Sequence, residues 1–410
     1  GLDDAQSCYY GLPRWKVWIA FMTLGMLAAI LGALWLAVAV AIFLFTGLGA
    51  LLQPWLQRRR ATNAARPPVS AILPIKLQNP GFEEAQASIF GQSYPDYEVL
   101  FGAAEASSPV VEIVQRLKLA HPDVAARIMQ SHCDLAVSPK LNTLAAPLAA
   151  AMHDFILTKD SNIVFDPETL AGYMQSFTSG VGLVVGVPVA ERPEGLAGNI
   201  EAFLLNGHAR LLLTASALNK GFGVGKAMLF RRSDLARAGG FEAMAYTLAE
   251  DTAISKGFAA IGLRTVFAHK TLRQIIGRRT LREIYDRQLR WSVIRRAHEP
   301  ATFPLEPLVS PLPAAIAAAF AAPLLGLSAL SAFALTLLVW FGCEILIAWL
   351  KGWEVSIFSP LAFLGREILA LLVWLRAWTT DDVVWANGRF DVFNGAQEAG
   401  ASAASREAGT

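Results

Sequence analysis

The segment FILTKDSN, Phe155–Asn162, decides the fold class of this chain. It begins with four residues typical of a buried strand and turns polar at Lys159, with Asp160 and Asn162 close behind. Ligands of open α/β sheets bind beyond the carboxyl ends of the strands, so a site is expected here. An Asp-x-Asn sequence suits a divalent cation on a nucleotide diphosphate, because Mg²⁺ is usually held by one or two carboxylates plus substrate phosphates.

Strands and helices are predicted to alternate on both sides of this segment. The other strand candidates are Val69–Ile75, Tyr97–Gly102, Ala126–Gln130, Val181–Val189 and Ala227–Arg231. The helix candidates are Glu83–Phe90, Pro109–Leu119, Leu141–Met152 and Pro167–Phe177. This alternation predicts an α/β domain with a mostly parallel sheet over residues 67–272.

Acidic residues follow other elements of this domain as well. Glu105 comes after the strand Tyr97–Gly102, and Glu250 and Asp251 precede a helical run. Together with Asp160, these residues can converge on one crevice of the sheet. The alternative is that each one caps a helix or a turn, which is what most Asp and Asn residues do at such places.

A long apolar block precedes the domain. The chain is 54% apolar and only 17% charged, against about 25% charged residues in a typical soluble domain. No charged residue occurs from Val17 to Gln57, about twice the 20 apolar residues that one membrane span needs. The block (15–57 with its flank, after a tail at 1–14) is therefore one long helix or a helical hairpin. The following Arg58-Arg59-Arg60 places the domain on the cytoplasmic side by the positive-inside rule.

A second apolar block, 308–378, follows the domain. It predicts two spans, roughly 309–326 and 329–350, and a third stretch, Ile357–Trp378, with Arg366-Glu367 at its centre. A charged pair is unfavourable in the middle of a bilayer, so an in-plane or re-entrant helix is favoured slightly over a third span. Residues 379–410 are expected to form a tail that is disordered from Asn394 onward.

Charge and cysteine content exclude several classes of protein. A net charge of +2 gives no indication of nucleic-acid binding. The three cysteines, Cys8, Cys133 and Cys343, lie far apart, which excludes a disulfide framework and a cysteine-based zinc site.

Arginines are concentrated just before the second apolar block, between Lys270 and His298. They are Arg273, Arg278, Arg279, Arg282, Arg287, Arg290, Arg295 and Arg296, and apolar residues are interleaved with them. This pattern predicts an amphipathic helical region, 273–300, on an anionic membrane surface. Arginine also binds diphosphate in bidentate fashion, and Arg287, Arg290 and Trp291 lie close together on such a helix.

These motifs together resemble a known family. Arg287-x-x-Arg290-Trp291 is similar to the (Q/R)xxRW signature of inverting, family 2-like glycosyltransferases with the GT-A fold, and Glu105, Asp160 and Asp251 resemble their three acidic sites. A closer resemblance is to ceramide glucosyltransferases and their bacterial relatives. It is carried by Pro74–Lys76, Ser93–Leu100, Ser138–Asn142, Val185–Pro188, Ala238–Phe241 and Ala249–Asp251. The resemblance implies a GT-A domain with a Rossmann-like mixed sheet and transmembrane helices.

The resemblance also implies a role for each matching residue. Asp251 is the implied catalytic base, and Asp160 the implied ligand of a divalent metal ion, Mg²⁺ or Mn²⁺. Contacts with the donor nucleotide are implied for Glu105, Lys140, Asp160, Asn162, Arg287 and Arg290, and contacts with the acceptor for Trp291, His208 and Glu250. The family usually has Asp at the position of Glu105. The segment Gly221–Lys226 is interpreted as a flexible loop at the acceptor site, with Asn219 and Lys220 beside it.

The implied reaction is inverting transfer of a sugar from a UDP-sugar to a lipid hydroxyl, with ceramide as the expected acceptor. In-line displacement needs a carboxylate to take the hydroxyl proton and cations to stabilise the leaving diphosphate. The expected partners are thus a UDP-sugar, a lipid acceptor and the lipid bilayer, with no nucleic acid. The expected location is a bacterial inner membrane, with the catalytic domain on the cytoplasmic face.

Several alternatives stay open at this point. Diacylglycerol, a hopanoid lipid or a growing polysaccharide are other possible acceptors, although three or four spans are few for a polymer channel. Glucose, galactose, glucuronic acid and N-acetylglucosamine are all possible donor sugars. A membrane scaffold with a degenerate glycosyltransferase domain is the alternative from another class, and the oligomeric state is not predicted.

Overall fold

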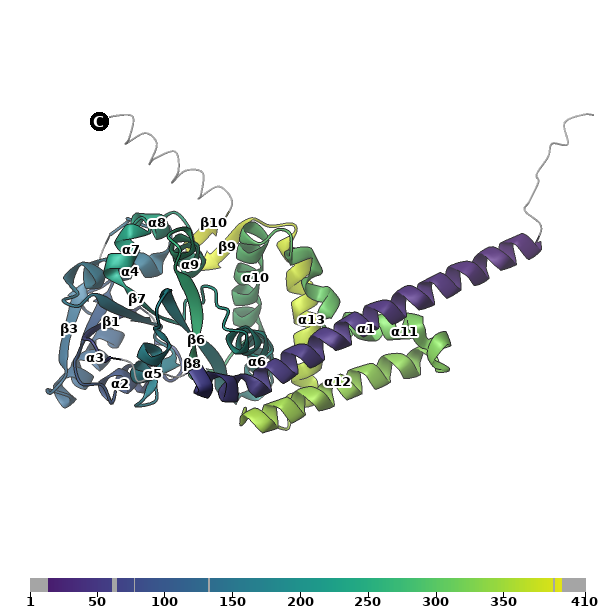
Figure 1. The fold of residues 1–410 in the computed structure, drawn as a ribbon, viewed down its shortest axis with the longest axis horizontal. Coiled ribbons are helices and arrows are strands. Elements are labelled where there is room, and N and C mark those ends of the chain that lie inside the picture. The colour runs from purple at the N-terminus through teal and green to yellow at the C-terminus, as the bar shows by residue number, and fades with distance from the viewer. Residues whose placement is uncertain (1–13, 61–64, 77, 132, 386–387, 393–410) are drawn as a thin grey trace, which may run out of the picture. The chain divides into compact units, whose positions relative to one another are not determined.

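The computed structural model of the 410-residue chain describes residues 14–60, 65–76, 78–131, 133–385 and 388–392. The chain divides into two units (Figure 1). The helical unit comprises the residues up to Leu44 together with Leu305–Glu344, and the α/β unit comprises Phe45–Pro304 together with the residues from Ile345 onward. The expected tail at residues 1–13 and the expected disorder from Asn394 fall outside the described residues.

An eight-stranded sheet forms the centre of the α/β unit, in the order β3-β2-β1-β4-β7-β6-β8-β5. The strands are β1 (Val69–Ile75), β2 (Tyr97–Ala103), β3 (Ala125–Gln130), β4 (Phe155–Lys159), β5 (Ile163–Val164), β6 (Val181–Glu194), β7 (Ala227–Arg231) and β8 (Arg264–Arg278). β1 pairs in parallel with β2 and β4, whereas β7 runs antiparallel to both β4 and β6. The α/β class and the mixed sheet are thus confirmed, and the sheet is less uniformly parallel than strand–helix alternation alone predicts.

Helices cover both faces of this sheet. Those that pack on its strands are α2 (Phe82–Phe90), α3 (Pro109–Ala120), α4 (Pro139–Ala150), α5 (Thr169–Ser176), α6 (Gly195–Ala217), α7 (Arg232–Arg237) and α9 (Glu250–Ala260). In an outer position, α8 (Glu242–Ala245) packs on α9, and α10 (Leu281–His298) and α13 (Ser359–Ala377) pack on α6 and on each other. Successive strand residues point to opposite faces, so Leu73 joins the apolar core on one face and Ile72 the core on the other. The strand candidates and helix candidates all form, whereas α6 and β8 are not among them.

The arginine-rich segment is not helical throughout, which corrects the prediction of one amphipathic helical region. Residues up to Arg278 belong to β8, which pairs with β6 (Leu272 opposite Pro188) and buries Ile275 and Ile276. Helix α10 begins only at Leu281, after a capping box in which Thr280 Oγ1 accepts from the backbone N–H of Glu283. Pairing with a neighbouring strand, which no local pattern reveals, decides the strand conformation.

The apolar N-terminal block forms one continuous helix, α1 (Arg14–Arg60), and not a hairpin. At 47 residues it is roughly 70 Å long, more than twice the thickness of a bilayer core. Its last turns belong to the α/β unit, where Gln57 Nε2 donates to Ser216 O at 2.8 Å and Arg60 Nη2 donates to Ala217 O at 2.9 Å. These side chains satisfy the carbonyls at the C-terminal end of α6.

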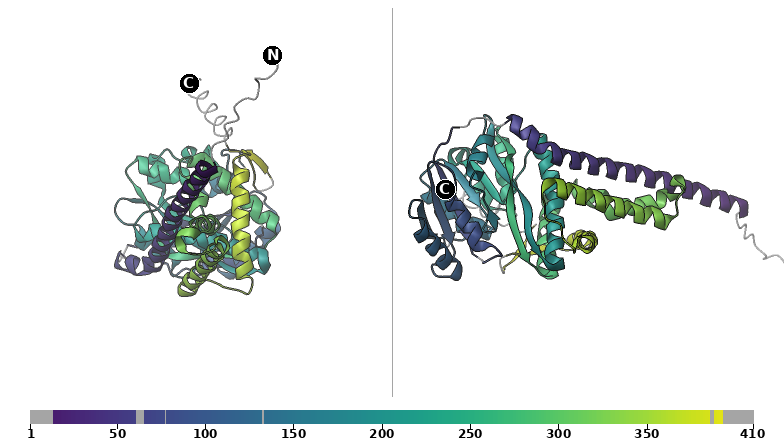
Figure 2. Two further views of the ribbon diagram at one scale, coloured as in Figure 1. Left: turned by 90° about the vertical axis from the view of Figure 1, so that its right-hand side faces the viewer. Right: turned by 90° about the horizontal axis from the view of Figure 1, so that it is seen from below.

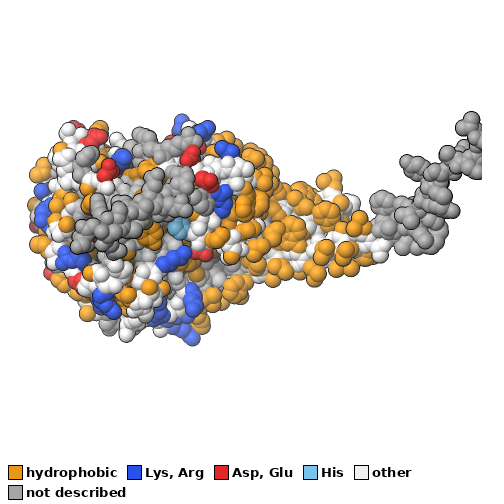
Figure 3. Space-filling view, turned by 90° about the horizontal axis from the view of Figure 1, so that it is seen from above, with side chains coloured by type: hydrophobic (Ala, Val, Ile, Leu, Met, Phe, Trp, Pro, Cys, Tyr) orange, Lys and Arg blue, Asp and Glu red, His pale blue; other side chains and the backbone are white. Residues whose placement is uncertain are grey.

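The helical unit contains the upstream part of α1, the short helix η1 (Phe303–Val309) in part, α11 (Pro311–Leu325) and the first part of α12 (Ala329–Lys351). Gly32 lies against α11 so closely that a Cβ there would be 2.6 Å from Ala317 O. On the face that Figure 3 shows, the coloured side chains of the helical unit are hydrophobic, whereas those of Lys, Arg, Asp and Glu gather on the α/β unit.

Two helices in the described part of the chain are long and apolar enough to span a membrane, Met22–Arg60 and Ala329–Lys351. η1 and α11 would add a third span only as a pair, and they are bent by 64° relative to each other. The span predicted at 309–326 is therefore a short helix with a sharp bend before it.

Helix α13 belongs to the α/β unit, where it packs along α6 and α10 (Figure 2). Its two central charges pair with each other, Arg366 Nε to Glu367 Oε1 at 2.8 Å, and both side chains are 7% exposed. After α13 in the chain, β9 (Asp382–Trp385) and β10 (Gly388–Asp391) pair in antiparallel orientation. β9 contacts α10. Part of the expected C-terminal tail is thus ordered structure.

Candidate active site

Asp160 lies directly after β4, at the carboxyl edge of the sheet. Antiparallel pairing puts the start of β7 beside the end of β4, and the backbone N–H of Asp160 donates to Lys226 O at 2.8 Å. The Asp160 carboxylate forms ion pairs with two ammonium groups, Lys140 Nζ at 2.9 Å and Lys226 Nζ at 3.3 Å. Burial would raise the pKa of Asp160, but these two cations outweigh it and hold the pKa below its usual value.

Lys140 connects Asp160 to the second acidic site. It is the second residue of α4, which begins at Pro139, a residue well suited to the first position of a helix. Its Nζ lies 3.2 Å from Glu250 Oε1 as well as 2.9 Å from Asp160 Oδ1. Burial would lower the pKa of Lys140, but Asp160 and Glu250 together raise it well above its usual value. One ammonium group therefore joins the end of β4 to the start of α9.

Glu250 and Asp251 form the first turn of α9, where the helix dipole favours negative charge. Burial raises the pKa of Glu250 against the attraction of Lys140, and the neighbouring Asp251 raises it further. Asp251 is held by backbone donors: Gly225 N–H donates to Oδ2 and Thr252 N–H donates to Oδ1, each at 2.7 Å. These two bonds set the orientation of the Asp251 carboxylate while its edge stays partly exposed.

The segment Gly221–Lys226 brings its backbone against these carboxylates. A Cβ on Gly223 would lie 1.9 Å from Asp251 O, and one on Gly225 would lie 3.3 Å from Asp251 Oδ2, Glu250 Oε1 and Lys140 Nζ alike. At Gly223 only glycine permits this approach, because the atoms met there belong to the backbone. The segment is thus part of the acidic site itself and not an NTPase-type phosphate loop. We call Lys140, Asp160, Lys226, Glu250 and Asp251 the edge cluster.

Helix α10 presents Arg290 and Trp291 to the edge cluster. Lys226 Nζ lies 5.9 Å from the centre of the Trp291 ring, within the range of a cation–π contact. Burial lowers the pKa of Arg290 to about 10, nearby Arg287 lowers it further, and Glu250 and Asp160 oppose the shift. Arg290 therefore stays charged at neutral pH and close to both carboxylates.

Arg287 has a partner that sequence reasoning does not identify. It forms an ion pair with Glu201 on α6, and Arg279 Nε lies 3.2 Å from the other oxygen of the same carboxylate. Glu201 is 3% exposed and is the only acidic residue of α6, which is the one signal in the sequence that singles it out. We call Glu201, Arg279 and Arg287 the Glu201 cluster. It anchors α10 to α6.

The remaining candidates lie outside the edge cluster. Glu105 is exposed in the bend after β2 and makes no hydrogen bond or ion pair with the described residues. His208 lies in α6, where Nδ1 is 3.0 Å from Leu204 O and the charged neighbours are Arg295 and Arg366. Asn162 lies in the turn between β4 and β5, two residues beyond Asp160. The structure thus brings together Lys140, Asp160, Glu250, Asp251, Arg290 and Trp291, but not Glu105 or His208.

The arrangement defines what this edge of the sheet can do chemically. A partly exposed carboxylate with a fixed orientation, Asp251, can accept a proton from a neighbouring hydroxyl. Around the same carboxylates, Lys140, Lys226 and Arg290 supply the positive charge that an anionic ligand needs. Among the described residues, no three His, Cys, Asp or Glu side chains are grouped so as to hold a metal ion by themselves.

The chain is similar to known glycosyltransferases over most of its length. Two ceramide glucosyltransferases of Caenorhabditis elegans are each 25% identical: number 1 over 79% of this chain and 71% of its own length, and number 3 over 82% and 75%. A solved mannosyltransferase, PcManGT of Pyrobaculum calidifontis in complex with GDP-Man and Mn²⁺, shares the fold. Its TM-score is 0.52 at 20% identity, over 84% of this chain and 99% of that one.

The family model of glycosyl transferase family 21 matches residues 33–398, which include the edge cluster, α10, the second part of α1, α11 and α12. This range covers far more than half of the chain, and the fold is the GT-A-like arrangement that the motifs imply. The chain therefore belongs to glycosyl transferase family 21 and is a ceramide glucosyltransferase-like hexosyltransferase.

Proposed function

We propose that this enzyme transfers a hexose from a UDP-sugar to the primary hydroxyl of ceramide, with inversion at the anomeric carbon and with Asp251 as the base. One observation carries the proposal: Lys140 ties Asp160 to the Glu250–Asp251 turn, so that a proton acceptor and a diphosphate-binding edge share one site. The names of the C. elegans relatives support ceramide as the acceptor.

The chemistry is a single displacement. The acceptor hydroxyl oxygen forms a bond to the anomeric carbon while the bond from that carbon to the UDP β-phosphate oxygen breaks. The hydroxyl proton goes to Asp251, whose oxygens are oriented by Gly225 and Thr252 N–H groups. Negative charge grows on the leaving diphosphate, where Arg290 and Lys226 stabilise it.

The residues present fit a divalent cation of the Mg²⁺ or Mn²⁺ type. Such ions are commonly held by one or two protein carboxylates, with substrate phosphates completing the shell, so a dedicated cage of side chains is not required. Asp160 is 22% exposed, and each of its oxygens already faces a cation, Lys140 or Lys226. Asp160 would hold the ion, with Asn162 beside it. When bound, the ion would neutralise diphosphate charge.

Other assignments follow from the same proposal. Trp291 and Glu250 would line the acceptor side, with His208 on α6 as a further acceptor contact. Glu105 would complete the donor side, and Arg287 would assist by holding α10 in place through Glu201. The apolar helices would hold the α/β unit at the cytoplasmic face, since Arg58, Arg59 and Arg60 end α1 on that side.

The test uses the full chain, purified and reconstituted in nanodiscs. It is supplied with ceramide, Mg²⁺ or Mn²⁺, and UDP-glucose, UDP-galactose, UDP-N-acetylglucosamine or UDP-glucuronic acid in turn, and lipids are analysed by mass spectrometry and NMR. We expect a β-linked hexosylceramide. Diacylglycerol and a hopanoid alcohol form the parallel acceptor arms: product from one of these alone would overturn ceramide, and an α-linked product would overturn inversion. No glycolipid in any arm, from protein that still binds UDP, would overturn the whole proposal.

A further inference from the structure

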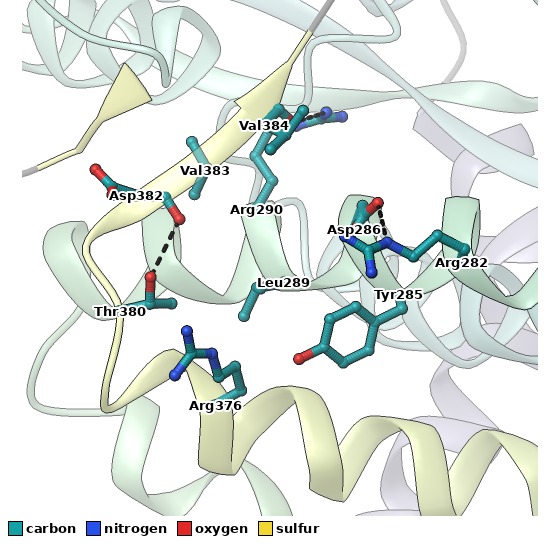
Figure 4. A pocket seen from close by; sticks show the side chains of 10 residues that line it. All are labelled: Arg282, Tyr285, Asp286, Leu289, Arg290, Arg376, Thr380, Asp382, Val383 and Val384. Atoms are coloured by element: carbon teal, nitrogen blue, oxygen red, sulfur yellow. Dashed lines mark hydrogen bonds and ion pairs between the residues drawn. The ribbon is translucent and has the colours of Figure 1, made fainter. Parts of the chain in front are cut away.

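A cavity of about 430 Å³ lies between α10, the last turn of α13 and β9, and Arg290 is one of its lining residues (Figure 4). Arg282, Tyr285 and Arg290 line it from α10, and Arg376 lines it from α13. The guanidinium of Arg376 and the hydroxyl of Tyr285 point into the same space in the close view. None of these residues except Arg290 has a part in the transfer reaction proposed above.

The positive charge around this cavity is only partly compensated. Asp286 and Asp382 also line it, and Asp286 Oδ2 accepts from Arg282 Nε at 2.8 Å. Arg290 Nη1 donates to the backbone oxygen of Val384 at 3.3 Å. Arg376 donates to Thr379 Oγ1 at 3.1 Å and makes no ion pair with any described residue. Three guanidinium groups thus face two carboxylates, and Arg376 is the cation left for a ligand.

Helix α13 leads from an apolar surface to this cavity. Its outer side chains, Leu361, Leu364, Ile368, Leu372 and Leu375, are 61%, 45%, 57%, 53% and 51% exposed and follow helical spacing along one face. Such a face is typical of a helix that lies in the plane of a membrane interface. Arg376 follows directly in the last turn, and Trp378, 44% exposed, ends the helix. Tryptophan and long basic side chains both favour the head-group level.

We propose that this cavity binds the phosphate head group of an acidic phospholipid whose acyl chains lie along the apolar face of α13. Arginine binds phosphate oxygens in bidentate fashion, and Arg376 and Arg282 reach the cavity from two different helices. Tyr285 supplies a further hydroxyl donor. Basic pockets at the cytoplasmic side of membrane helices bind lipid head groups on the same grounds. Ceramide carries no phosphate, so the ligand proposed for this cavity is not the acceptor.

The test measures lipid retention by native mass spectrometry of the full chain, released from mixed micelles of phosphatidylglycerol and phosphatidylcholine. We expect the wild type to retain phosphatidylglycerol in preference to phosphatidylcholine. Charge-assisted hydrogen bonds are strong, so the double variant Arg282→Gln/Arg376→Gln should bind phosphatidylglycerol with about tenfold lower affinity than the wild type. Arg116→Gln is the matched control, since Arg116 is 68% exposed and lies on α3, away from the cavity. Equal loss in the control would overturn the proposal.

Two further arms separate the outcomes. The wild type is also titrated with inorganic phosphate and with glycerol 1-phosphate, and displacement of phosphatidylglycerol by either at millimolar concentration would assign the site to a soluble phosphate and overturn a lipid ligand. The lipid preference of the wild type is measured without any variant. The proposal can therefore be overturned even if the double variant fails to fold. Equal retention of the two lipids by the wild type would overturn it.

Discussion

The edge cluster and the Glu201 cluster are built from the same kinds of side chain but differ in access. In the edge cluster, Asp160, Lys226, Lys140 and Glu250 are 22%, 18%, 11% and 7% exposed, and in the Glu201 cluster, Arg287, Arg279 and Glu201 are 21%, 6% and 3% exposed. Carboxylates outnumber cations in the first cluster, and the reverse holds in the second. The most exposed carboxylate of the edge cluster, Asp160, can thus exchange its ion pairs for contacts with a ligand, whereas the single carboxylate of the Glu201 cluster is buried and cannot.

Helix α10 joins the two clusters. Arg287 pairs with Glu201, and Arg290, less than one turn later, lies within electrostatic range of Glu250 and Asp160. Within the Arg-x-x-Arg-Trp motif, the first arginine therefore anchors the helix and the second faces the site. We expect substitutions in one cluster to change turnover and substitutions in the other to change stability.

The largest expected effect separates the clusters by activity. Asp251→Asn keeps the shape of the side chain but removes the proton acceptor, so turnover should fall by about 10²–10⁴-fold while UDP binding is retained. Glycolipid formation and UDP titration measure the two quantities. Asp123→Asn, at an exposed loop position, is the control. Turnover within a factor of two of the wild type would remove Asp251 as the base.

The next effect is on stability. Glu201→Ala leaves Arg279 and Arg287 without their carboxylate, and breaking a buried pair in this way should lower the free energy of unfolding by about 3–5 kcal/mol. Glu194→Ala is the matched control, because Glu194 is 61% exposed and 3.9 Å from Arg278, and should change it by about 0–1 kcal/mol. Denaturant unfolding measures both. Equal effects would mean that burial does not distinguish these ion pairs.

Arg290 and Arg287 test the division within α10. Arg290→Lys keeps the charge but loses the planar set of donors, so turnover should fall by about 10²–10³-fold, as for the loss of one positioned donor. Arg287→Lys should act mainly on the melting temperature. Steady-state kinetics and thermal melting of both variants measure this. If Arg287→Lys lowered turnover as far as Arg290→Lys at unchanged stability, the first arginine would contact substrate after all.

A smaller effect concerns the start of α10. Thr280→Ala removes the cap that accepts from Glu283 N–H and should cost about 1 kcal/mol of unfolding free energy. Thr280→Ser keeps the hydroxyl and should be close to neutral. Chemical denaturation of the two variants tests this, and equal losses would show that the methyl group and not the cap is what stabilises the helix.

The smallest effect is one of pH. The pKa of Asp160 is lowered in the folded protein, so its ion pairs stabilise the fold above the usual Asp value, about 3.9, and are lost as pH falls through the folded value. The difference in melting temperature between wild type and Asp160→Asn should shrink below about pH 4. A difference that does not shrink between about pH 4 and pH 2 would contradict the lowered pKa.

Local pattern is sufficient for the strands that carry the site. β1, β2, β4 and β7 are runs of apolar residues followed by polar ones, and each forms where its sequence predicts it. β8 and α6 are not predictable in this way. β8 mixes Arg273 and Gln274 with Leu272 and Ile275, and only its pairing with β6 makes an extended conformation favourable.

The residues of the candidate site also fall into those that a local motif identifies and those that only the fold identifies. Asp160, Asp251 and Arg290 are identifiable because each stands in a short motif with an ordinary chemical reason. Glu201 carries no motif, and its role depends on α6 crossing behind α10, a contact between residues 86 positions apart in the chain. Glu105 and His208 fit motifs equally well, but the fold places neither in the edge cluster.

By itself the sequence determined the class of the fold, the apolar helices and the residue types at the sheet edge, because hydrophobic periodicity and strand-end motifs are local. Only the tertiary structure decided that α1 is one continuous helix, that Arg366 and Glu367 pair inside the protein, and that Lys140 joins Asp160 to Glu250. The Lys140 contacts join residues far apart in the chain, and the burial of Arg366 and Glu367 comes from the packing of α13 on other helices, so neither can be read from a local pattern.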